Sequence, residues 1–110
     1  MNYNIETTDD FNKEIKRLNK KYRSLKSDFQ NLLDNLEKEL ILATDLGNGF
    51  KKIRINIKSK GKGASGGGRI ITYETIVAVD ETNVIFTIIY DKSDYDNISI
   101  AVLKKNLNLE

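Results

Sequence analysis

The 110-residue sequence contains neither cysteine nor histidine. The absence of cysteine excludes disulfides, thiolate catalysis and cysteine-based zinc sites. The absence of histidine removes the side chain that most often serves as a general base or a metal ligand near neutral pH. The sequence also lacks an apolar run long enough to span a bilayer, and its start lacks the basic and apolar regions of a signal peptide. We therefore expect one soluble, cytoplasmic domain that covers residues 1–110.

Positive charge is concentrated in one stretch, from Lys51 to Arg69. This stretch holds seven basic residues and no acidic one, whereas the whole chain has 18 basic and 16 acidic residues and a net charge of only +2. The rest of the chain is therefore acidic. A concentrated positive segment on an acidic body is typical of a binding site for an anionic partner. Its basic residues are Lys51, Lys52, Arg54, Lys58, Lys60, Lys62 and Arg69.

The basic stretch has the pattern of two strands joined by a glycine-rich turn. Ile53, Ile55 and Ile57 alternate with polar residues, which indicates a strand with one buried face and one open face. Residues 59–68 include five glycines and have no apolar periodicity, so we expect a mobile loop or a wide hairpin turn there. This loop lacks the GK[ST] ending of a phosphate-binding P-loop and precedes a strand. A second strand begins at Arg69, so the cations are expected to line the first strand's open face, the loop and the start of the return strand.

Two amphipathic helices are predicted before the basic stretch. Thr7 or Thr8 caps the first, and two aspartates in its first turn suit the helix dipole. Ser24 caps the second, whose leucine stripe continues to Leu40. The connection between the helices is short, which predicts an antiparallel helical hairpin.

The remaining segments complete the predicted fold. Residues 2–6 form a short edge strand, residues 84–90 a well-buried strand and residues 98–107 a C-terminal helix. The sequence therefore predicts an α+β domain with the order β-α-α-β-β-β and then a helix. The helical hairpin is expected to pack on one face of a small antiparallel sheet, leaving the other face partly open with the cations on it.

Three segments resemble the signature of the RelE/ParE toxin superfamily, in particular its RelE- and HigB-like members. They are FKKIRI from Phe50, the turn KGKGASGGGR with the following IITY, and IIYDKSD at the end of the last strand. The resemblance covers about residues 3–107. It implies a RelE-like fold and a toxin of a type II toxin–antitoxin pair, with a cognate antitoxin that covers the C-terminal helix or the basic face.

The resemblance leaves three functions open. RelE- and HigB-like members cleave mRNA on the ribosome without a metal or another cofactor, which is the expected activity. ParE-like members inhibit DNA gyrase instead, and the third alternative is a non-catalytic binding module on the same fold. Arrest of protein synthesis, arrest of DNA synthesis or no toxicity would distinguish these three functions.

The resemblance also assigns roles to individual residues. Lys52 and Arg54 match the family's cationic strand positions, and Arg69 matches its strand-start arginine, which would clamp a phosphate. Tyr90 and Tyr95 are candidates to stack on a base or to donate a proton. The candidate catalytic residues are therefore Lys52, Arg54, Arg69, Tyr90, Lys92 and Tyr95, and the candidate nucleic-acid-binding residues are Lys51, Lys58, Lys60 and Lys62.

RNA cleavage needs a base for the ribose 2′-OH, cations for the phosphorane and an acid for the 5′-oxygen. The resemblance implies that lysine, arginine and tyrosine take these roles in place of histidine. A lysine acts as a base only if neighbouring cations and burial lower its pKa well below about 10.4. HigB-like members commonly use a histidine that this chain lacks, so which residue is base and which is acid stays open.

Structural explanations exist for several of these residues. The lysine-rich turn also suits a solvated hairpin that blocks edge-to-edge aggregation. Arg69 could pair with Glu74 or Asp91, and Tyr90 could belong to the core. As a surface cation, however, Arg69 is expected to be replaceable by alanine with loss of toxicity and without unfolding.

A cluster of acidic residues follows the last predicted strand. Asp91, Asp94 and Asp96 lack the glycine and the terminal glutamate of a calcium loop, so we interpret them as solvated turn acids.

Overall fold

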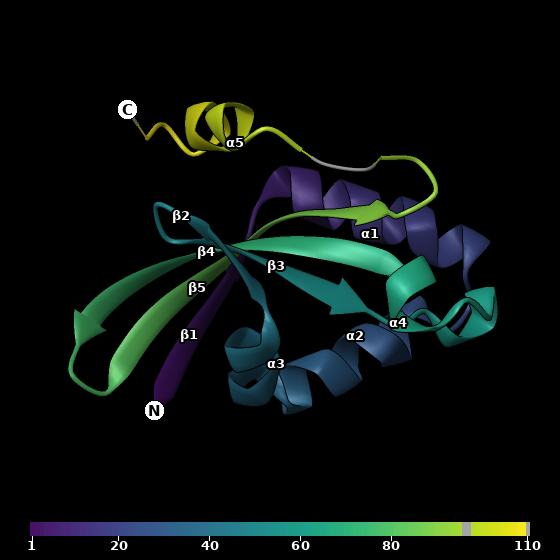
Figure 1. Cartoon of the computed structure of the whole chain (residues 1–110), viewed down its shortest axis with the longest axis horizontal. Helices are drawn as coiled ribbons and strands as arrows, with labels where there is room; N and C mark the ends of the chain where they lie inside the picture. Colours follow the sequence, from purple (N-terminus) through teal and green to yellow (C-terminus); the bar gives the residue numbers. More distant parts are fainter. Residues whose placement is uncertain (96–97, 110) are drawn as a thin grey trace.

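The computed structural model describes residues 1–95 and 98–109, which form a five-stranded mixed sheet with helices on both faces (Figure 1). The predicted α+β class is confirmed. The strands are β1 (Asn2–Thr7), β2 (Thr44–Gly47), β3 (Phe50–Ile55), β4 (Gly68–Ala78) and β5 (Glu81–Asp91). The helical segments are α1 (Asp9–Lys21), α2 (Leu25–Asp34), α3 (Leu36–Leu42), the 3₁₀ turn η1 (Lys58–Lys60), α4 (Gly63–Gly66) and α5 (Ile100–Asn106).

The sheet has the strand order β1-β5-β4-β3-β2. β1 pairs in parallel with β5, from Asn2 opposite Glu81 to Thr7 opposite Phe86, whereas the other neighbours are antiparallel. The prediction of an antiparallel sheet was therefore wrong for β1. A tight turn forces consecutive strands to run antiparallel, but β1 is separated from the other strands by helices, so no turn sets its direction.

The N-terminal helices follow the predicted pattern with one interruption. Thr8 caps α1, and its Oγ1 accepts a hydrogen bond from the Phe11 amide at 3.0 Å. The second predicted helix is divided at Asn35 into α2 and α3, although its leucine stripe remains buried throughout. Ser24 makes no side-chain cap bond; its hydroxyl donates to Asp28 Oδ2 at 2.6 Å and accepts from the Ser59 amide at 2.8 Å.

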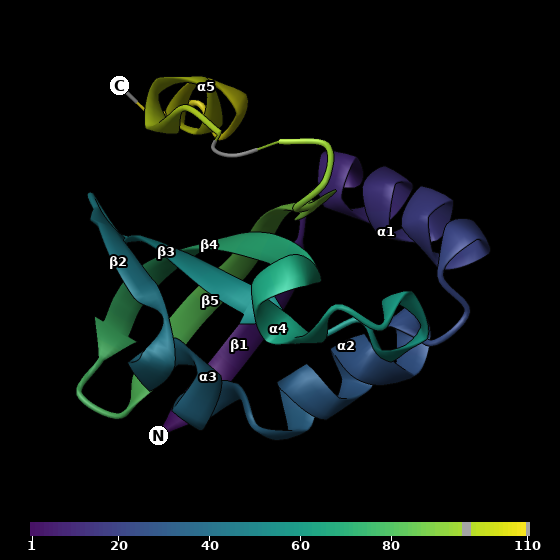
Figure 2. The same cartoon turned by 45° about the vertical axis from the view of Figure 1, so that its right-hand side comes forward.

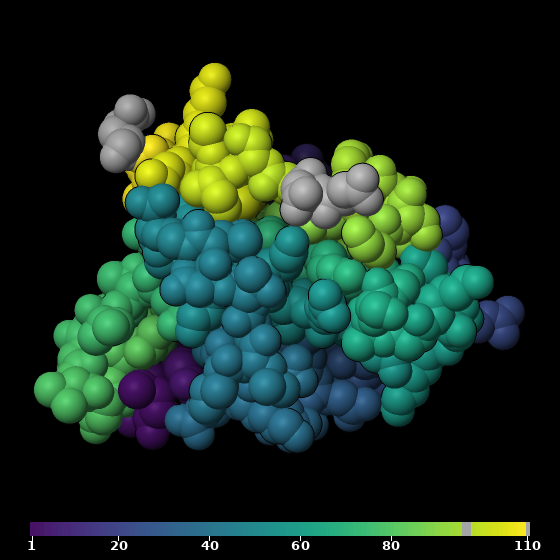
Figure 3. All heavy atoms as spheres, in the orientation of Figure 1, coloured from purple at the N-terminus to yellow at the C-terminus, as the bar shows by residue number. Residues whose placement is uncertain are grey.

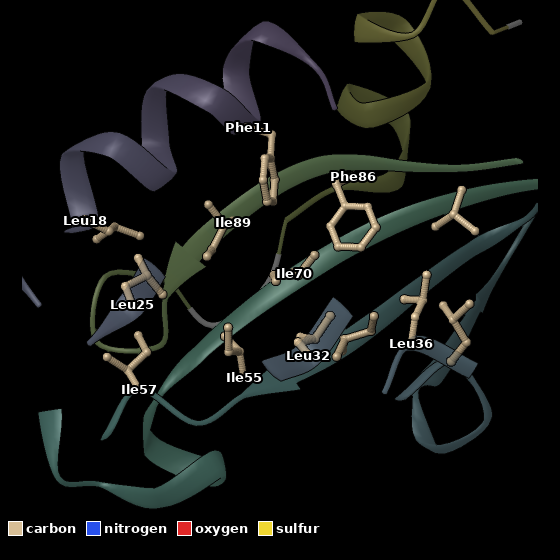
Figure 4. Packing of buried hydrophobic residues seen from close by; sticks show 13 residues of the cluster. Phe11, Leu18, Leu25, Leu32, Leu36, Ile55, Ile57, Ile70, Phe86 and Ile89 are labelled. Carbon is tan, nitrogen blue, oxygen red and sulfur yellow. The ribbon is translucent and has the colours of Figure 1, made fainter. Parts of the chain in front are cut away.

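Two apolar clusters lie on opposite faces of the sheet. The larger lies between the sheet and α1, α2 and α3, where Phe11, Leu25 and Phe86 meet Ile70 of β4 (Figure 4). The adjacent residue Ile71 belongs to the second cluster, because successive strand residues point to opposite faces. Its buried members are Phe50, Ile71, Tyr90 and Leu103.

α5 contributes Leu103 to the second cluster and so covers part of the face opposite α1 and α2. The predicted C-terminal helix is confirmed. α5 leaves the rest of this face uncovered, as the predicted partly open face requires. Within the residues that the structure describes, no helix combines the length and the apolar character needed to cross a membrane.

Candidate nucleic-acid interface

Three candidate site residues form a row across the sheet. Arg54 of β3 lies opposite Arg69 of β4, and Arg69 lies opposite Tyr90 of β5. Strand alternation places this row on the same face as Phe50 and Ile71, which is the face that α5 partly covers. The sheet therefore brings together residues from three strands, as the order of the predicted elements implied.

Arg69 is buried, with only 5% of its surface exposed. Its guanidinium donates to the carbonyl oxygens of Ala64, Ser65 and Gly68 at 2.9–3.1 Å. Burial, and then the nearby Arg54, lower the pKa of Arg69 below its ordinary value. The prediction that Arg69 is a surface cation was therefore wrong, because α4 folds over it and supplies carbonyl acceptors.

Lys52 and Arg54 line a surface groove next to α4. Arg54 is exposed and Lys52 is half-buried, and both point to the face of β3 that also carries Phe50. The groove is bounded by the end of α3, the start of β2 and Ala64 of α4. Figure 2 shows α4 beside β3 and β4, with α5 farther along the molecule. An anion in this groove would meet two cationic side chains, whereas the only acid among the described residues that line it is Glu39 of α3.

The glycine-rich segment connects the antiparallel strands β3 and β4, which confirms the wide hairpin turn, and it is folded into η1 and α4 instead of an irregular loop. Gly61 and Gly63 have φ angles of 74° and 65°, in the left-handed region that glycine adopts readily. Gly67 packs against β3 so closely that a Cβ atom there would lie 2.2 Å from the carbonyl oxygen of Ile55. These glycines therefore permit a compact shape that other residues would not.

η1 is joined to the N-terminus of α2 by hydrogen bonds. The amide of Lys58 donates to Asp28 Oδ2 at 3.1 Å, and the amide of Ser59 donates to Ser24 Oγ at 2.8 Å. Asp28 is buried although its sequence position gave no signal of a special role. Neither Ser24 nor Asp28 was predicted to shape the basic segment, because their contacts with it join residues 35 and 30 positions apart. Lys58 and Lys62 themselves are exposed, as predicted for phosphate contacts.

Two of the predicted phosphate-binding lysines are paired with acids. Lys51 Nζ lies 3.1 Å from Glu74 Oε1 and donates to the carbonyl oxygen of Leu40 at 3.3 Å. Lys51 therefore points toward α3, on the face of β3 opposite Arg54. Lys60 Nζ lies 2.6 Å from Asp91 Oδ1. The acids that were considered as partners of Arg69 thus bind lysines.

Asp91 is fully buried, so its interpretation as a solvated turn acid was wrong. It accepts hydrogen bonds from Lys60 Nζ and, at 2.5 Å, from Tyr22 Oη. Burial raises the pKa of Asp91, but these hydrogen bonds outweigh burial and hold that pKa well below its usual range. Asp94 is exposed, and Asp96 lies outside the described residues.

The two candidate tyrosines pack against each other. Their ring centroids are 6.0 Å apart in an edge-to-face arrangement, with Tyr90 buried in the second cluster and Tyr95 55% exposed. The core explanation of Tyr90 is therefore confirmed. Both tyrosines line a second groove of mixed charge, together with Lys13 and Arg17 and with the acids Asp10, Glu14 and Asp94. Arg54 of the first groove and Tyr90 of the second lie two strands apart, with buried Arg69 between them. At the usual spacing of neighbouring strands, their backbones are roughly 10 Å apart.

The interface thus combines exposed cations with one exposed aromatic ring. It can bind a phosphate at Arg54 and Lys52 and stack a base on Tyr95. Lys92 lies at the end of β5, where its amide donates to the carbonyl oxygen of Gly67 at 3.1 Å. Within residues 1–95 and 98–109, no cluster of three or more acidic side chains could bind a metal ion.

Residues 11–108 match the family model described as the RelE toxin of the RelE/RelB toxin–antitoxin system. This chain belongs to the RelE toxin family. The match includes every candidate site residue named above. Membership of the family implies that this protein is the toxin of a toxin–antitoxin system and has a cognate antitoxin. RelE-family toxins are generally endoribonucleases. A search of the curated proteins found no match.

Proposed function

We propose that this RelE-family toxin inhibits translation by cleaving mRNA on the ribosome, without a metal ion. One observation carries the proposal: a groove lined by Lys52 and Arg54 lies on the same sheet face as the row that ends at Tyr90, whose buried ring packs against the exposed ring of Tyr95. A phosphate and an adjacent base of single-stranded RNA need such a combination of cations and an exposed aromatic ring.

The candidate residues take different roles in this proposal. Arg54 and Lys52 bind the scissile phosphate and stabilise the negative charge that develops on the phosphorane. Tyr95 stacks on a base, and the ring of Tyr90 packs edge-to-face against the ring of Tyr95 and holds it in place. Arg69 acts indirectly, by binding the carbonyl oxygens of the α4 turn that borders the cationic groove.

The proton transfers are assigned to Lys52 and Lys92, which are candidate catalytic residues that carry a titratable proton and are not buried in the core. Tyr95 is the third candidate only if it moves from its stacking position to within hydrogen-bond reach of the phosphate. Single replacements of each, followed by the pH dependence of the cleavage rate, identify the base and the acid. Loss of the base removes the acidic limb of the profile, and loss of the acid removes the basic limb.

The experiment is inducible expression in a bacterial host, with pulse labelling of protein and DNA synthesis and mapping of mRNA 5′ ends. We expect rapid loss of protein synthesis and cuts inside translated codons. Arg54→Met should remove the cuts, because the phosphate loses its exposed ligand. Lys38→Met on α3 is the matched control, since Lys38 is an exposed cation outside both grooves.

Two other results would contradict the proposal. Arrest of DNA synthesis with intact messages would indicate a ParE-like gyrase inhibitor. Continued growth with normal amounts of folded toxin would indicate a non-catalytic binding module. Undiminished cleavage by Arg54→Met would leave RNA cleavage in place but remove this groove as the phosphate site.

A further inference from the structure

We propose that Asp91 is a positioning residue that shapes both segments flanking the site, and that Lys60 binds Asp91 instead of a phosphate. The inference rests on the proposed function only where it concerns RNA. It removes Lys60 from the candidate phosphate-binding residues. It also gives a structural role to Asp91, whose negative charge does not suit contact with RNA.

Asp91 lies at the end of β5, fully buried, and uses both carboxylate oxygens. Oδ1 accepts from Lys60 Nζ at 2.6 Å and from the Ser93 amide at 2.9 Å. Oδ2 accepts from Tyr22 Oη at 2.5 Å, and Lys21 Nζ lies 3.9 Å away. A buried carboxylate with partners from α1, η1 and its own turn fixes these segments relative to β5.

The first of the two segments is the basic one, residues 58–67. Lys60 connects it to β5, and the Lys92 amide donates to the carbonyl oxygen of Gly67 at 3.1 Å. Figure 3 shows this segment, in teal-green, next to the lime-coloured residues that follow β5. The position of the exposed cations Lys58 and Lys62 therefore depends on contacts made at the end of β5.

The second segment is the turn after β5, which carries Lys92 and Tyr95. Besides its side-chain bond to Ser93, Asp91 accepts at its backbone oxygen from the amides of Asp94 and Tyr95, at 2.9 Å and 3.4 Å. This arrangement is an aspartate-initiated turn. The same residue thus directs the exposed ring of Tyr95 and the end of the basic segment.

Lys60 has no donor left for RNA. A lysine ammonium has three protons, and Lys60 Nζ has three acceptors: Asp91 Oδ1 at 2.6 Å, Ser93 Oγ at 2.8 Å and the Gly67 carbonyl oxygen at 3.4 Å. Only 10% of its side chain is exposed. A phosphate could bind Lys60 only by displacing one of these three acceptors, and it would then compete with a buried carboxylate for the same ammonium group.

The first test uses the salt dependence of binding to a single-stranded RNA oligonucleotide. Each phosphate contact contributes about 0.7 to the slope of log affinity against log salt. We expect Lys62→Met, the matched control in the same segment, to lower the slope by about 0.7. Lys60→Met should lower the slope no more than Asp91→Asn, which disturbs the same segment without removing a cation. A fall of the slope in Lys60→Met that exceeds the fall in Asp91→Asn by about 0.7 would overturn the reassignment of Lys60.

The second test does not depend on RNA, so it separates this inference from the proposed function. Amide hydrogen exchange of the free protein should accelerate in residues 58–67 and 92–95 of Asp91→Asn, and not in Asp94→Asn, whose carboxylate is exposed. Tyr22→Phe removes one hydroxyl and keeps the ring, so it gives a smaller effect of the same kind if Asp91→Asn does not fold. Unchanged exchange in both variants would refute the positioning role, even if the protein cleaves RNA.

A third readout distinguishes positioning from general loss of stability. On programmed ribosomes, at a temperature where all variants are folded, Asp91→Asn should lower kcat about tenfold or more with little change in KM, because misplaced groups lose reactive geometry. Equal kcat and KM for Asp91→Asn and the unmodified toxin would contradict the proposal.

Discussion

Arg54 and Arg69 offer a matched pair of substitutions. They lie directly opposite each other on β3 and β4, on the same face of the sheet, yet Arg54 is exposed and Arg69 is buried. Arg69→Ala should therefore destabilise the fold, and Arg54→Ala should not. The contrast tests whether α4 depends on Arg69 as the structure indicates.

The magnitude follows from the hydrogen bonds of Arg69. Its guanidinium makes three, to the carbonyl oxygens of Ala64, Ser65 and Gly68. At roughly 1 kcal/mol for each net bond lost, Arg69→Ala should lower the free energy of unfolding by about 3 kcal/mol. The individual bonds to a charged donor are stronger, but the substitution also removes the cost of burying the guanidinium. Arg54→Ala should change the free energy by about 0.5 kcal/mol or less.

Denaturant unfolding followed by circular dichroism measures both values. A loss of about 3 kcal/mol corresponds to a fall in melting temperature of roughly 10 to 20 °C, well beyond experimental error. Arg69→Lys should recover part of the loss, because lysine keeps one charged donor. Equal unfolding free energies for Arg69→Ala and the unmodified protein would show that α4 does not depend on this side chain, and the burial argument would fail.

Three further predictions concern the same region. Gly67→Ala should destabilise the protein by about 1–3 kcal/mol in denaturant unfolding, because its Cβ would lie 2.2 Å from the Ile55 carbonyl oxygen, whereas Ala64→Ser at an exposed position should not. Because folding lowers the pKa of Asp91, ionised Asp91 stabilises the fold fully above the unfolded-state pKa of about 4, and this stabilisation is lost as the pH falls from that value toward the folded-state pKa. Asp91→Asn should therefore flatten the acid side of a curve of unfolding free energy against pH. Tyr95→Ala should cost only about 0.5–1.5 kcal/mol of stability, the contribution of its edge-to-face pair with Tyr90, but weaken RNA binding by roughly 1–3 kcal/mol in a fluorescence titration, since the ring is exposed and available to stack.

Local patterns predicted the residues that the sheet brings together. Alternation along β3 identified the face that carries Lys52 and Arg54, and the expected strand pairing brought Arg69 next to Arg54. The leucine stripes identified the core side of α2 and α3, although they did not reveal the break at Asn35. These features depend on side-chain period and on neighbours along the chain, which a sequence displays directly.

Burial of charged groups could not be predicted in the same way. Asp91 is buried because Tyr22 and Lys60, 69 and 31 positions away, supply its hydrogen bonds. Arg69 is buried because the backbone of α4 turns its carbonyl oxygens toward the guanidinium, and backbone geometry in a glycine-rich segment has no side-chain signature. In each case the deciding partner belongs to another element of the fold.

The parallel pairing of β1 with β5 has a consequence for how this toxin is made. β1 is the first strand synthesised, but its partner is the last, and hydrogen-bonded residues such as Asn4 and Asn83 are 79 positions apart. Contacts between such distant residues form late, because closing the long intervening chain costs conformational entropy. A growing chain therefore cannot complete the sheet, or the row of Arg54, Arg69 and Tyr90, before β5 has been synthesised. A nascent polypeptide in which β5 has not yet been made would therefore lack the row that carries the candidate site.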